Sequence, residues 1–220
     1  FRTTLATAQV AVAMTLLMTA GLFLKSLWKV GRVNLGLQVE HLMTFGLRPE
    51  ASGYDSVRTR ALFADVEARL RNLPGAVAAT SAMVPLIAGN NWNDCIAIEG
   101  LPPDLNGCTI SWFNGIGAGH FKAIGVPLLA GREFDDGGDL GRPKVAIVNE
   151  AFARKFGLGP NPVGKHMAEG TSSDTATLDI EIVGLVRDMK YFDVKQDLRP
   201  VFFRPYRQRR GVGQLRFYVR

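Results

Sequence analysis

The stretch Leu5–Leu24 (LATAQVAVAMTLLMTAGLFL) decides how the rest of this 220-residue chain is organised. No charged side chain occurs from Thr3 to Leu24, and a helix of about 22 residues, rising about 1.5 Å per residue, crosses a hydrocarbon core of about 30 Å. Basic and aromatic side chains typical of helix ends at a membrane surface flank it, namely Arg2 before it and Lys25, Trp28, Lys29 and Arg32 after it. The sequence therefore predicts a transmembrane helix, with its flanks, over residues 1–32.

Two alternatives compete with this prediction. A signal peptide has an apolar region of about 7 to 15 residues and a small-residue cleavage site, whereas this stretch is longer and has no clear A-x-A site. A buried core helix is typically about 11 to 12 residues long. We favour the membrane helix over both, and we expect the protein to extend before Phe1 and beyond Arg220.

The composition leaves room for this helix and about one ordinary domain. Lys and Arg number 26 against 20 Asp and Glu, a net charge of +6. One basic cluster flanks the predicted membrane helix and the other lies near the end of the chain: Arg204, Arg207, Arg209, Arg210, Arg216 and Arg220. Few aromatic side chains accompany them as a stacking platform, so a nucleic-acid partner is not expected.

The segment after the helix follows a strand, helix and strand pattern. Val33–Glu40 is a short connection, and His41–Pro49 is predicted to be a strand. Asp55 is placed to cap a helix that runs to about Asn72. Its apolar side chains recur at three- and four-residue spacing, at Leu62, Phe63, Val66, Leu70 and Leu73. A second apolar strand starts at Ala76, and the short connections predict two parallel strands with a right-handed crossover.

From Pro85 onward the pattern predicts short strands with two short helices. Alternating segments at 94–99 and 108–113 form a predicted hairpin, and further strands are expected at 144–149, 179–188, 200–206 and 214–220. The two helices are expected at 120–125 and after Asn149, the second ending at Gly157. VPLLAGREF (126–134) is interpreted as a turn. The fold class expected for the whole is α+β.

Cys95 and Cys108 are the only cysteines, and they lie on either side of the turn-rich EGLPPDLNG. A tightly closed hairpin would place them opposite one another. A cross-strand disulfide is then expected if this region lies outside the cytoplasm. Two free buried thiols are the alternative, which mass spectrometry of the non-reduced protein distinguishes.

Two motifs resemble nucleotide-binding sites, but each lacks residues that such a site requires. GPNPVGK (159–165) matches G-x-x-x-x-G-K, but a helix precedes it, Pro160 and Pro162 remove two N–H donors, and His166 replaces the hydroxyl that would hold magnesium. GIGAG (115–119) has His120 where a dinucleotide fingerprint needs glycine. No metal-ligand spacing or nucleophile with a base occurs. We therefore expect no catalytic, cofactor-binding or metal-binding residues.

Several stretches, taken in order, resemble one family. They are AQVAVAMTLLMTAGLFLKSLWKV (8–30), NLGLQVEHLMTFGL (34–47), LRNLPGAVAATSAMVPL (70–86), GHFKAIGVPLLAGREF (119–134), VAIVNEAFARKF (145–156), NPVGKHM (161–167), IEIVGLVRDMKY (180–191) and RPVFFRPY (199–206). Together they resemble the MacB-like periplasmic core domain of ABC transporter permeases of the multi-span macrolide-export-type or FtsX-like kind. Residues 119–134 and 145–156 are the most specific, since order and spacing both match.

The resemblance implies a bacterial inner-membrane permease subunit with the residues after about 32 in the periplasm. Residues 33–84 would form the first half of a porter-like βαβ part, 85–213 an inserted β-rich part, and 214–220 the start of the second porter half. The implied partners are a cytoplasmic ABC ATPase, a second copy or a paired permease, a periplasmic adaptor and membrane lipid. The positive-inside rule fits badly, because Lys25, Lys29 and Arg32 would face the periplasm.

The leading functional hypothesis is a non-catalytic module for export or efflux. In it, ATP hydrolysis by the partner moves the helix and thereby changes the state of the periplasmic domain. A lipoprotein-releasing permease shares this architecture and is the first alternative. A membrane-anchored extracytoplasmic sensor, in which ligand binding alone moves the helix, is the second.

Overall fold

In the computed structural model the chain divides into two compact units, Phe1–Asn34 and Leu35–Arg220. The structure describes residues 2–31, 33–89, 92–101, 109–136, 141–170, 177–194, 197–209 and 211–220. Each unit has its own architecture and is described separately.

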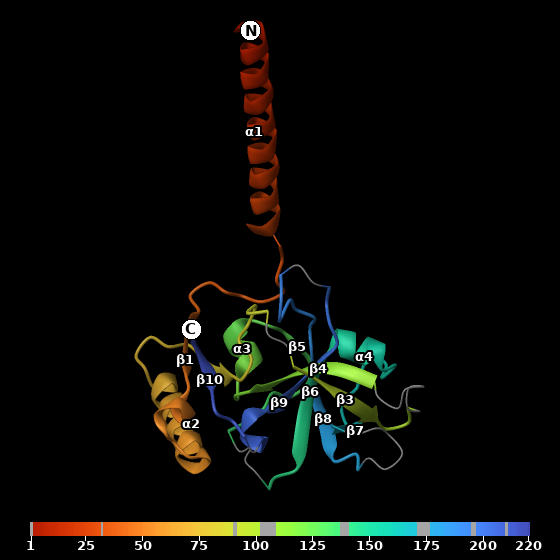
Figure 1. Ribbon diagram of the computed structural model, residues 1–220. Helices are drawn as coiled ribbons and strands as arrows, with labels where there is room; N and C mark the ends of the chain where they lie inside the picture. Colours follow the sequence, from red (N-terminus) through yellow and green to blue (C-terminus); the bar gives the residue numbers. More distant parts are fainter. Residues whose placement is uncertain are drawn as a thin grey trace. The chain divides into compact units, whose positions relative to one another are not determined.

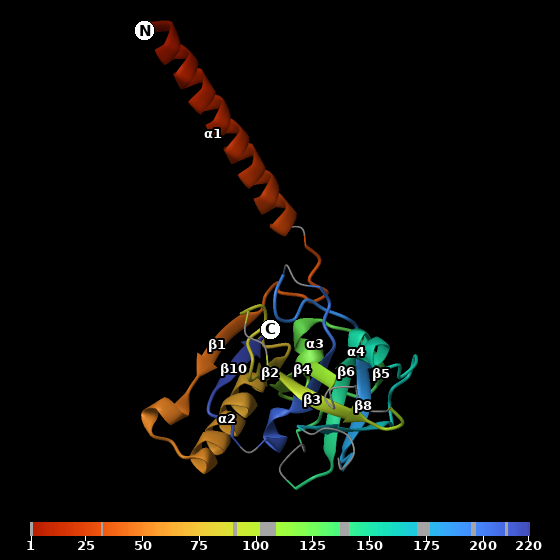
Figure 2. The same cartoon turned by 45° about the vertical axis from the view of Figure 1, so that its right-hand side comes forward.

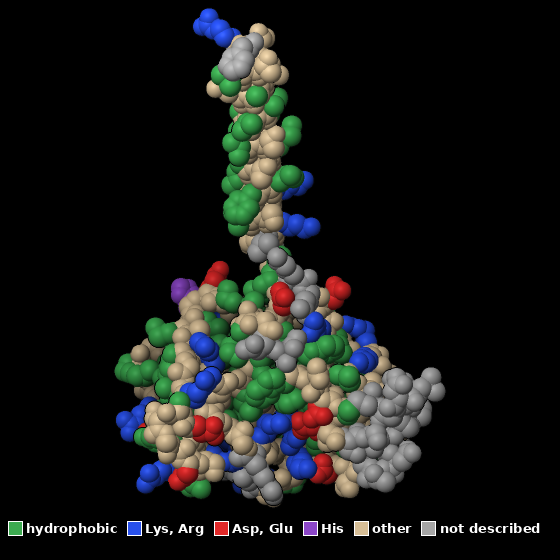
Figure 3. Space-filling model, in the orientation of Figure 1, with side chains coloured by type: hydrophobic (Ala, Val, Ile, Leu, Met, Phe, Trp, Pro, Cys, Tyr) green, Lys and Arg blue, Asp and Glu red, His purple; other side chains and the backbone are tan. Residues whose placement is uncertain are grey.

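The first unit is a single helix, α1 (Arg2–Gly31), of 30 residues. Within Arg2–Lys29, the most apolar window of 18 residues has a mean hydropathy of 1.8. No residue of that window is buried. Thr7, Thr15 and Thr19 donate their hydroxyl hydrogens to carbonyls four residues earlier, so these polar groups are satisfied inside the helix. Apolar side chains line the visible face of the helix, with lysines near one end (Figure 3). By length and composition α1 can cross a membrane.

Among the residues that the structure describes, the second unit combines ten short strands with three α-helices and two 3₁₀ turns, whose arrangement is drawn in Figure 1. The strands are β1 (Met43–Leu47), β2 (Ala79–Ala82), β3 (Trp92–Ile98), β4 (Thr109–Ile116), β5 (Leu128–Gly131), β6 (Lys144–Asn149), β7 (His166–Glu169), β8 (Ile180–Val186), β9 (Val201–Pro205) and β10 (Leu215–Val219). The helices are α2 (Ser56–Arg71), α3 (His120–Ile124) and α4 (Glu150–Lys155), and the turns are η1 (Pro49–Ser52) and η3 (Tyr206–Gln208). The α+β class predicted from the sequence is confirmed.

Local capping signals place two helix starts where the sequence predicts them. The Asp55 carboxylate accepts the Arg58 N–H at 2.8 Å at the start of α2, and the Asn149 side-chain oxygen accepts the Phe152 N–H at 3.0 Å at the start of α4. After α4, Gly157 adopts a left-handed φ of 57°, which suits the position after a helix end. Both helices therefore begin at residues whose side chains replace missing backbone partners.

The first strand, helix and strand form a split βαβ arrangement (Figure 2). β1 and β2 run in the same direction, as predicted, but β10 lies between them and pairs antiparallel with both. The pairing joins residues far apart in the chain, with Phe45 opposite Phe217. α2 covers one face of these strands, where Phe63 lies 6.0 Å from Phe217 between ring centroids.

Six of the other strands form a closed ring of paired neighbours. Neighbours pair in the order β4, β3, β7, β8, β6 and β9, and β9 pairs back with β4 in parallel register. These six strands therefore form a small barrel. One core cluster takes apolar side chains from all six strands, and α4 adds Phe152 and Phe156 to it. The β-rich character expected after Pro85 thus takes the form of a closed and packed barrel.

Two local predictions were wrong. VPLLAGREF contains a strand, β5, which pairs with β8, and β7 was not predicted at all. Both strands have only four residues, too few for alternation to show. On α2, Phe63 is buried and Val66 and Leu70 pack against the same core cluster, as the apolar spacing predicts, whereas Leu73 lies beyond the helix and is 47% exposed. Thr59 and Glu67 are buried as well.

Candidate functional site

The two cysteines named by the sequence are only partly placed. Cys95 lies on β3, opposite Ile110 of β4. Cys108 lies outside the described residues. The disulfide between them stays a prediction.

The loop GPNPVGK (159–165), which matches a phosphate-binding motif, has three backbone N–H groups that already donate to acceptors within the protein. Gly164 N–H donates to the Ile182 carbonyl at 2.8 Å, and Lys165 N–H donates to the Pro162 carbonyl at 3.2 Å. Val163 N–H donates to the Asn161 side chain at 3.2 Å. These groups do not form the open cradle that a phosphate requires.

The titratable side chains do not assemble into a metal site in the part of the chain that the structure describes. His41 and His166 are exposed, whereas His120 is fully buried. The segment at the start of the second unit instead contacts residues that are far from it in the sequence.

We call residues 35–42 the lead-in segment, and they are fastened to the second unit at several points. The Leu35 carbonyl accepts the Lys190 N–H at 2.8 Å, and Gln38 N–H donates to the Ile124 carbonyl at 2.8 Å. Arg220 donates to the Gln38 side-chain oxygen at 2.6 Å and also to its carbonyl. Leu37 and Leu42 pack against the core cluster that contains α3. The segment is thus a packed part of the domain and not a free linker.

Gly36 is required at its position in the lead-in segment for two reasons. Its φ is 71°, in the left-handed region, and a Cβ there would lie 2.9 Å from the Asp188 carbonyl oxygen. We expect Gly36→Ala to lower the free energy of unfolding by about 2 kcal/mol, measured by denaturant titration.

Gly53→Ala is the matched control for this prediction. Gly53 has a φ of 80° but nothing within 4 Å of its added Cβ, so only the backbone cost of about 1 kcal/mol is expected. Equal losses for both substitutions would show that the lead-in segment does not pack against Asp188 in solution.

A second segment, residues 187–192, contacts the lead-in segment through Asp188 and Lys190, and we call it the bridging segment. Its Arg187 N–H donates to the Pro127 carbonyl at 3.1 Å, and its Tyr191 carbonyl accepts the Ile87 N–H at 2.9 Å. Asp188 accepts the Ala151 N–H at 2.8 Å, which fixes the start of α4. The bridging segment therefore connects the lead-in segment to α4 and to the segment after β2.

A buried polar network lies beneath the bridging segment. The Tyr191 hydroxyl lies 3.1 Å from His120 Nε2, and Asn114 Nδ2 donates to that hydroxyl at 2.7 Å. Asn114 also exchanges two hydrogen bonds of 2.9 Å with the backbone of Val84. Burial lowers the pKa of His120 to about 3, against an opposing hydrogen bond to the Ser81 backbone. The imidazole is therefore neutral and joins Tyr191 to α3 and β2.

None of these contacts carries a signal in the local sequence. Gly36, Asp188 and Tyr191 belong to no periodic pattern, and the hydrogen bonds of the lead-in segment join residues up to 182 positions apart. The single glycine between two leucines in NLGLQVE, Gly36, was the one available indication of a packed turn.

Comparison with known protein families gives one match over nearly the whole chain. Residues 3–220 match the family described as the MacB-like periplasmic core domain. A comparison with curated proteins found no match.

Three solved structures show weaker likeness. A domain of a putative permease protein from Porphyromonas gingivalis is 19% identical, with a TM-score of 0.45, and the match covers 70% of this chain and 64% of that one. The extracellular domain of the noncanonic ABC-type transporter YknZ from Gram-positive bacteria is 16% identical, with a TM-score of 0.46 and 81% of each chain covered. The periplasmic region of MacB from Actinobacillus actinomycetemcomitans is 13% identical, with a TM-score of 0.47, covering 87% of this chain and 79% of that one. The chain thus spans less than two thirds of the first of these structures.

Proposed function

The chain belongs to the family of the MacB-like periplasmic core domain of ABC-type transporter permeases, and from this premise we propose that it transmits movement. In this proposal a cytoplasmic ABC ATPase hydrolyses ATP, α1 moves, and the second unit changes its packing against a second copy or a paired permease. The result is export or efflux of a substrate. The chain itself supplies no chemical step.

The fastening of the lead-in segment is the observation that carries this proposal. A flexible linker would absorb a displacement of a few ångströms, whereas hydrogen bonds at Leu35 and Gln38 pass it to the bridging segment and to α3. The buried network of His120 and Tyr191 then passes it into the sheet. Polar contacts that are buried and mutually satisfied resist deformation better than exposed ones.

A second set of contacts supports movement of the whole unit as one body. Glu67 of α2 accepts a hydrogen bond from Arg207 of η3 at 2.9 Å. Arg209, just after η3, donates to Glu169 of β7 at 2.7 Å, and Arg60 of α2 donates to the Arg207 carbonyl at 3.3 Å. Because these two ion pairs and this hydrogen bond join α2 to the barrel through η3, a force on one part reaches the other.

The remaining parts of the proposal follow the family. We place the protein in the bacterial inner membrane with the second unit in the periplasm, where a periplasmic adaptor and membrane lipid are further partners. The porter-like part would comprise residues 33–84 and the start of its second half at 214–220, and residues 85–213 would form the insertion. The split arrangement of β1, β10 and β2 supports this division, because β10 comes from the end of the chain.

The test is an insertion of about eight Gly and Ser residues between Asn34 and Leu35, which adds about 15 Å of slack. The full permease and its ATPase are reconstituted in lipid, and hydrogen exchange of residues 35–220 is compared with and without ATP. We expect ATP hydrolysis to persist while the ATP-dependent change in exchange falls about tenfold.

The same insertion within the turn-rich segment 99–107 is the control, and it should leave the ATP-dependent change intact. An unchanged response in the Asn34–Leu35 insertion would refute transmission through the lead-in segment. Extraction of lipoproteins instead of soluble compounds by the reconstituted system would identify the lipoprotein-releasing alternative. A response to ligand without any ATPase would identify a sensor.

A further inference from the structure

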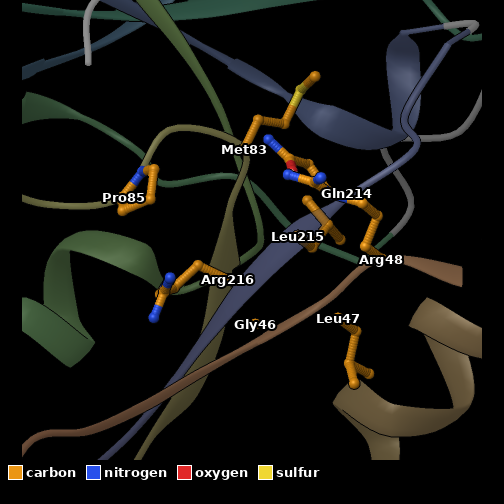
Figure 4. Close-up of a pocket in the computed structure, with 8 residues that line it drawn as sticks. All are labelled: Gly46, Leu47, Arg48, Met83, Pro85, Gln214, Leu215 and Arg216. Carbon is orange, nitrogen blue, oxygen red and sulfur yellow. The ribbon is translucent and has the colours of Figure 1, made fainter. Parts of the chain in front are cut away.

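A cavity of about 230 Å³ opens where β1 ends and β10 begins. Its walls combine two guanidinium groups and an amide with apolar side chains, as Figure 4 shows for Arg48, Gln214, Arg216, Leu47, Met83, Pro85 and Leu215, with Gly46 between them. The alternation of the strands explains this mixture. Leu215 and Phe217 of β10 pack toward α2, so Gln214 and Arg216 occupy the opposite face.

Neither arginine of this cavity is neutralised within the described part of the chain. Six other arginines form ion pairs with carboxylates there, at residues 69, 71, 154, 204, 207 and 209. Arg48 instead donates its Nε and Nη2 hydrogens to the Gln214 side-chain oxygen, at 3.0 and 2.6 Å. Glu50 is only two residues from Arg48 in the sequence. Its carboxylate lies beside Gly213, in the space that a side chain at position 213 would occupy.

The two guanidinium groups therefore retain unused donors beside the cavity. An arginine has five N–H donors in a planar fork that matches the two oxygens of a carboxylate. Arg48 uses two of its donors on Gln214, which fixes its orientation. No hydrogen-bond acceptor for Arg216 occurs among the residues that the structure describes.

Gly46 is an exposed residue that lines the cavity. It lies opposite Arg216 in the strand register, and a Cβ on it would be 3.7 Å from the Arg216 Cζ, an ordinary contact distance. A larger side chain at this exposed position would thus enter the cavity without straining the backbone. The absence of a side chain lets the Arg216 guanidinium lie close over the strand, and a large side chain at position 46 would displace it.

We propose that this cavity binds the carboxylate of a small organic acid. The two positively charged guanidinium groups favour a negatively charged oxygen group on the ligand. The apolar side chains of Met83, Pro85 and Leu215 suit a ligand with a short aliphatic chain. The volume lies below the range of about 300 to 1,000 Å³ that holds drug-sized ligands, so a four-carbon acid is of suitable size. This binding goes beyond the transmission of movement and does not depend on it.

The experiment uses the whole chain in nanodiscs of zwitterionic phosphatidylcholine, with succinate as the probe, in about 0.15 M NaCl to screen non-specific attraction. Saturation-transfer NMR follows the methylene protons of succinate as its concentration rises. We expect saturable binding that becomes about tenfold weaker in Arg216→Gln and in Gly46→Leu, because the first removes charge-assisted hydrogen bonds and the second fills the cavity. Arg58→Gln, an exposed arginine on α2, is the matched control and should bind as the unaltered chain does.

Two results would overturn the proposal. One is succinate binding that is absent from the unaltered chain, or equal in Arg216→Gln, Arg58→Gln and the unaltered chain. The other is displacement of succinate by inorganic phosphate at concentrations well below those at which succinate saturates, which would make this a phosphate site. Thermal unfolding of each variant confirms that it is folded, and if Gly46→Leu fails this check, Arg216→Gln decides. Failure of the insertion experiment on the permease leaves this result unaffected.

Discussion

Replacing Glu67 by alanine is expected to lower the free energy of unfolding by about 3 kcal/mol. The Glu67 side chain is only 2% exposed and lies on α2, where its carboxylate accepts the Arg207 guanidinium at 2.9 Å and the Ser81 hydroxyl at 2.5 Å. Removing one partner of a buried ion pair leaves the other charge without compensation, which costs about 3 to 5 kcal/mol in fully buried cases. Arg207 is 23% exposed, so the lower end of that range applies.

Asp65 on the same helix provides the control. Its ion pair with Arg69 measures 2.9 Å, but the two side chains are 53% and 79% exposed, so Asp65→Ala should cost no more than about 0.5 kcal/mol. Chemical denaturation of both variants gives the comparison, and the double variant Glu67→Ala with Arg207→Ala should lose less than the sum of the two single losses. Similar losses for Glu67→Ala and Asp65→Ala would show that the buried pair does not join α2 to η3 in solution.

The position of Glu67 also explains a glycine that resembled part of a nucleotide motif. A Cβ at Gly117 would lie 2.9 Å from Glu67 Oε1 and 2.8 Å from Ser81 Oγ. Gly117 therefore makes room for the carboxylate beneath α2. Gly119, two residues later, has a φ of 64° at the start of α3. The run GIGAG thus serves close packing and a turn.

The sequence predicted those elements whose causes are local. Asp55 and Asn149 cap helices because a side chain replaces the backbone partner three residues away, which the residue type alone indicates. Leu5–Leu24 was recognised by its length and lack of charge. Strand alternation located most of β1, β6, β8, β9 and β10 for the same reason.

Contacts between distant parts of the chain could not be predicted in this way. The insertion of β10 between β1 and β2 depends on pairs such as Phe45 with Phe217, and barrel closure depends on Phe113 beside Phe202. Glu67 is buried on α2 because Ser81 and Arg207 meet it from elsewhere in the chain. The fastening of the lead-in segment is of this kind too, so the family resemblance indicated the domain but not the contacts that join it to the helix.

Lowering the pH from 7 to 5 is expected to destabilise the second unit by about 2 kcal/mol through His120. His120 is fully buried, and its pKa falls from 6.5 to about 3. The unfolded chain therefore takes up a proton near pH 6.5 while the folded chain does not, so the stability present above pH 6.5 is lost as the pH falls toward 3. The slope approaches about 1.4 kcal/mol per pH unit in this window. The range from 7 to 5 is chosen because most carboxylates titrate below it.

Denaturant titrations at pH 7, 6 and 5 test this on three chains. His120→Gln should be less stable at pH 7, because the contact with Tyr191 is altered, but its stability should change far less between pH 7 and 5. His166→Gln is the control, since His166 is exposed on β7, and it should keep the pH dependence of the unaltered chain. Parallel pH dependence in the unaltered chain and in His120→Gln would contradict the buried neutral imidazole. It would also remove the link through which we propose that the bridging segment passes movement to α3 and β2.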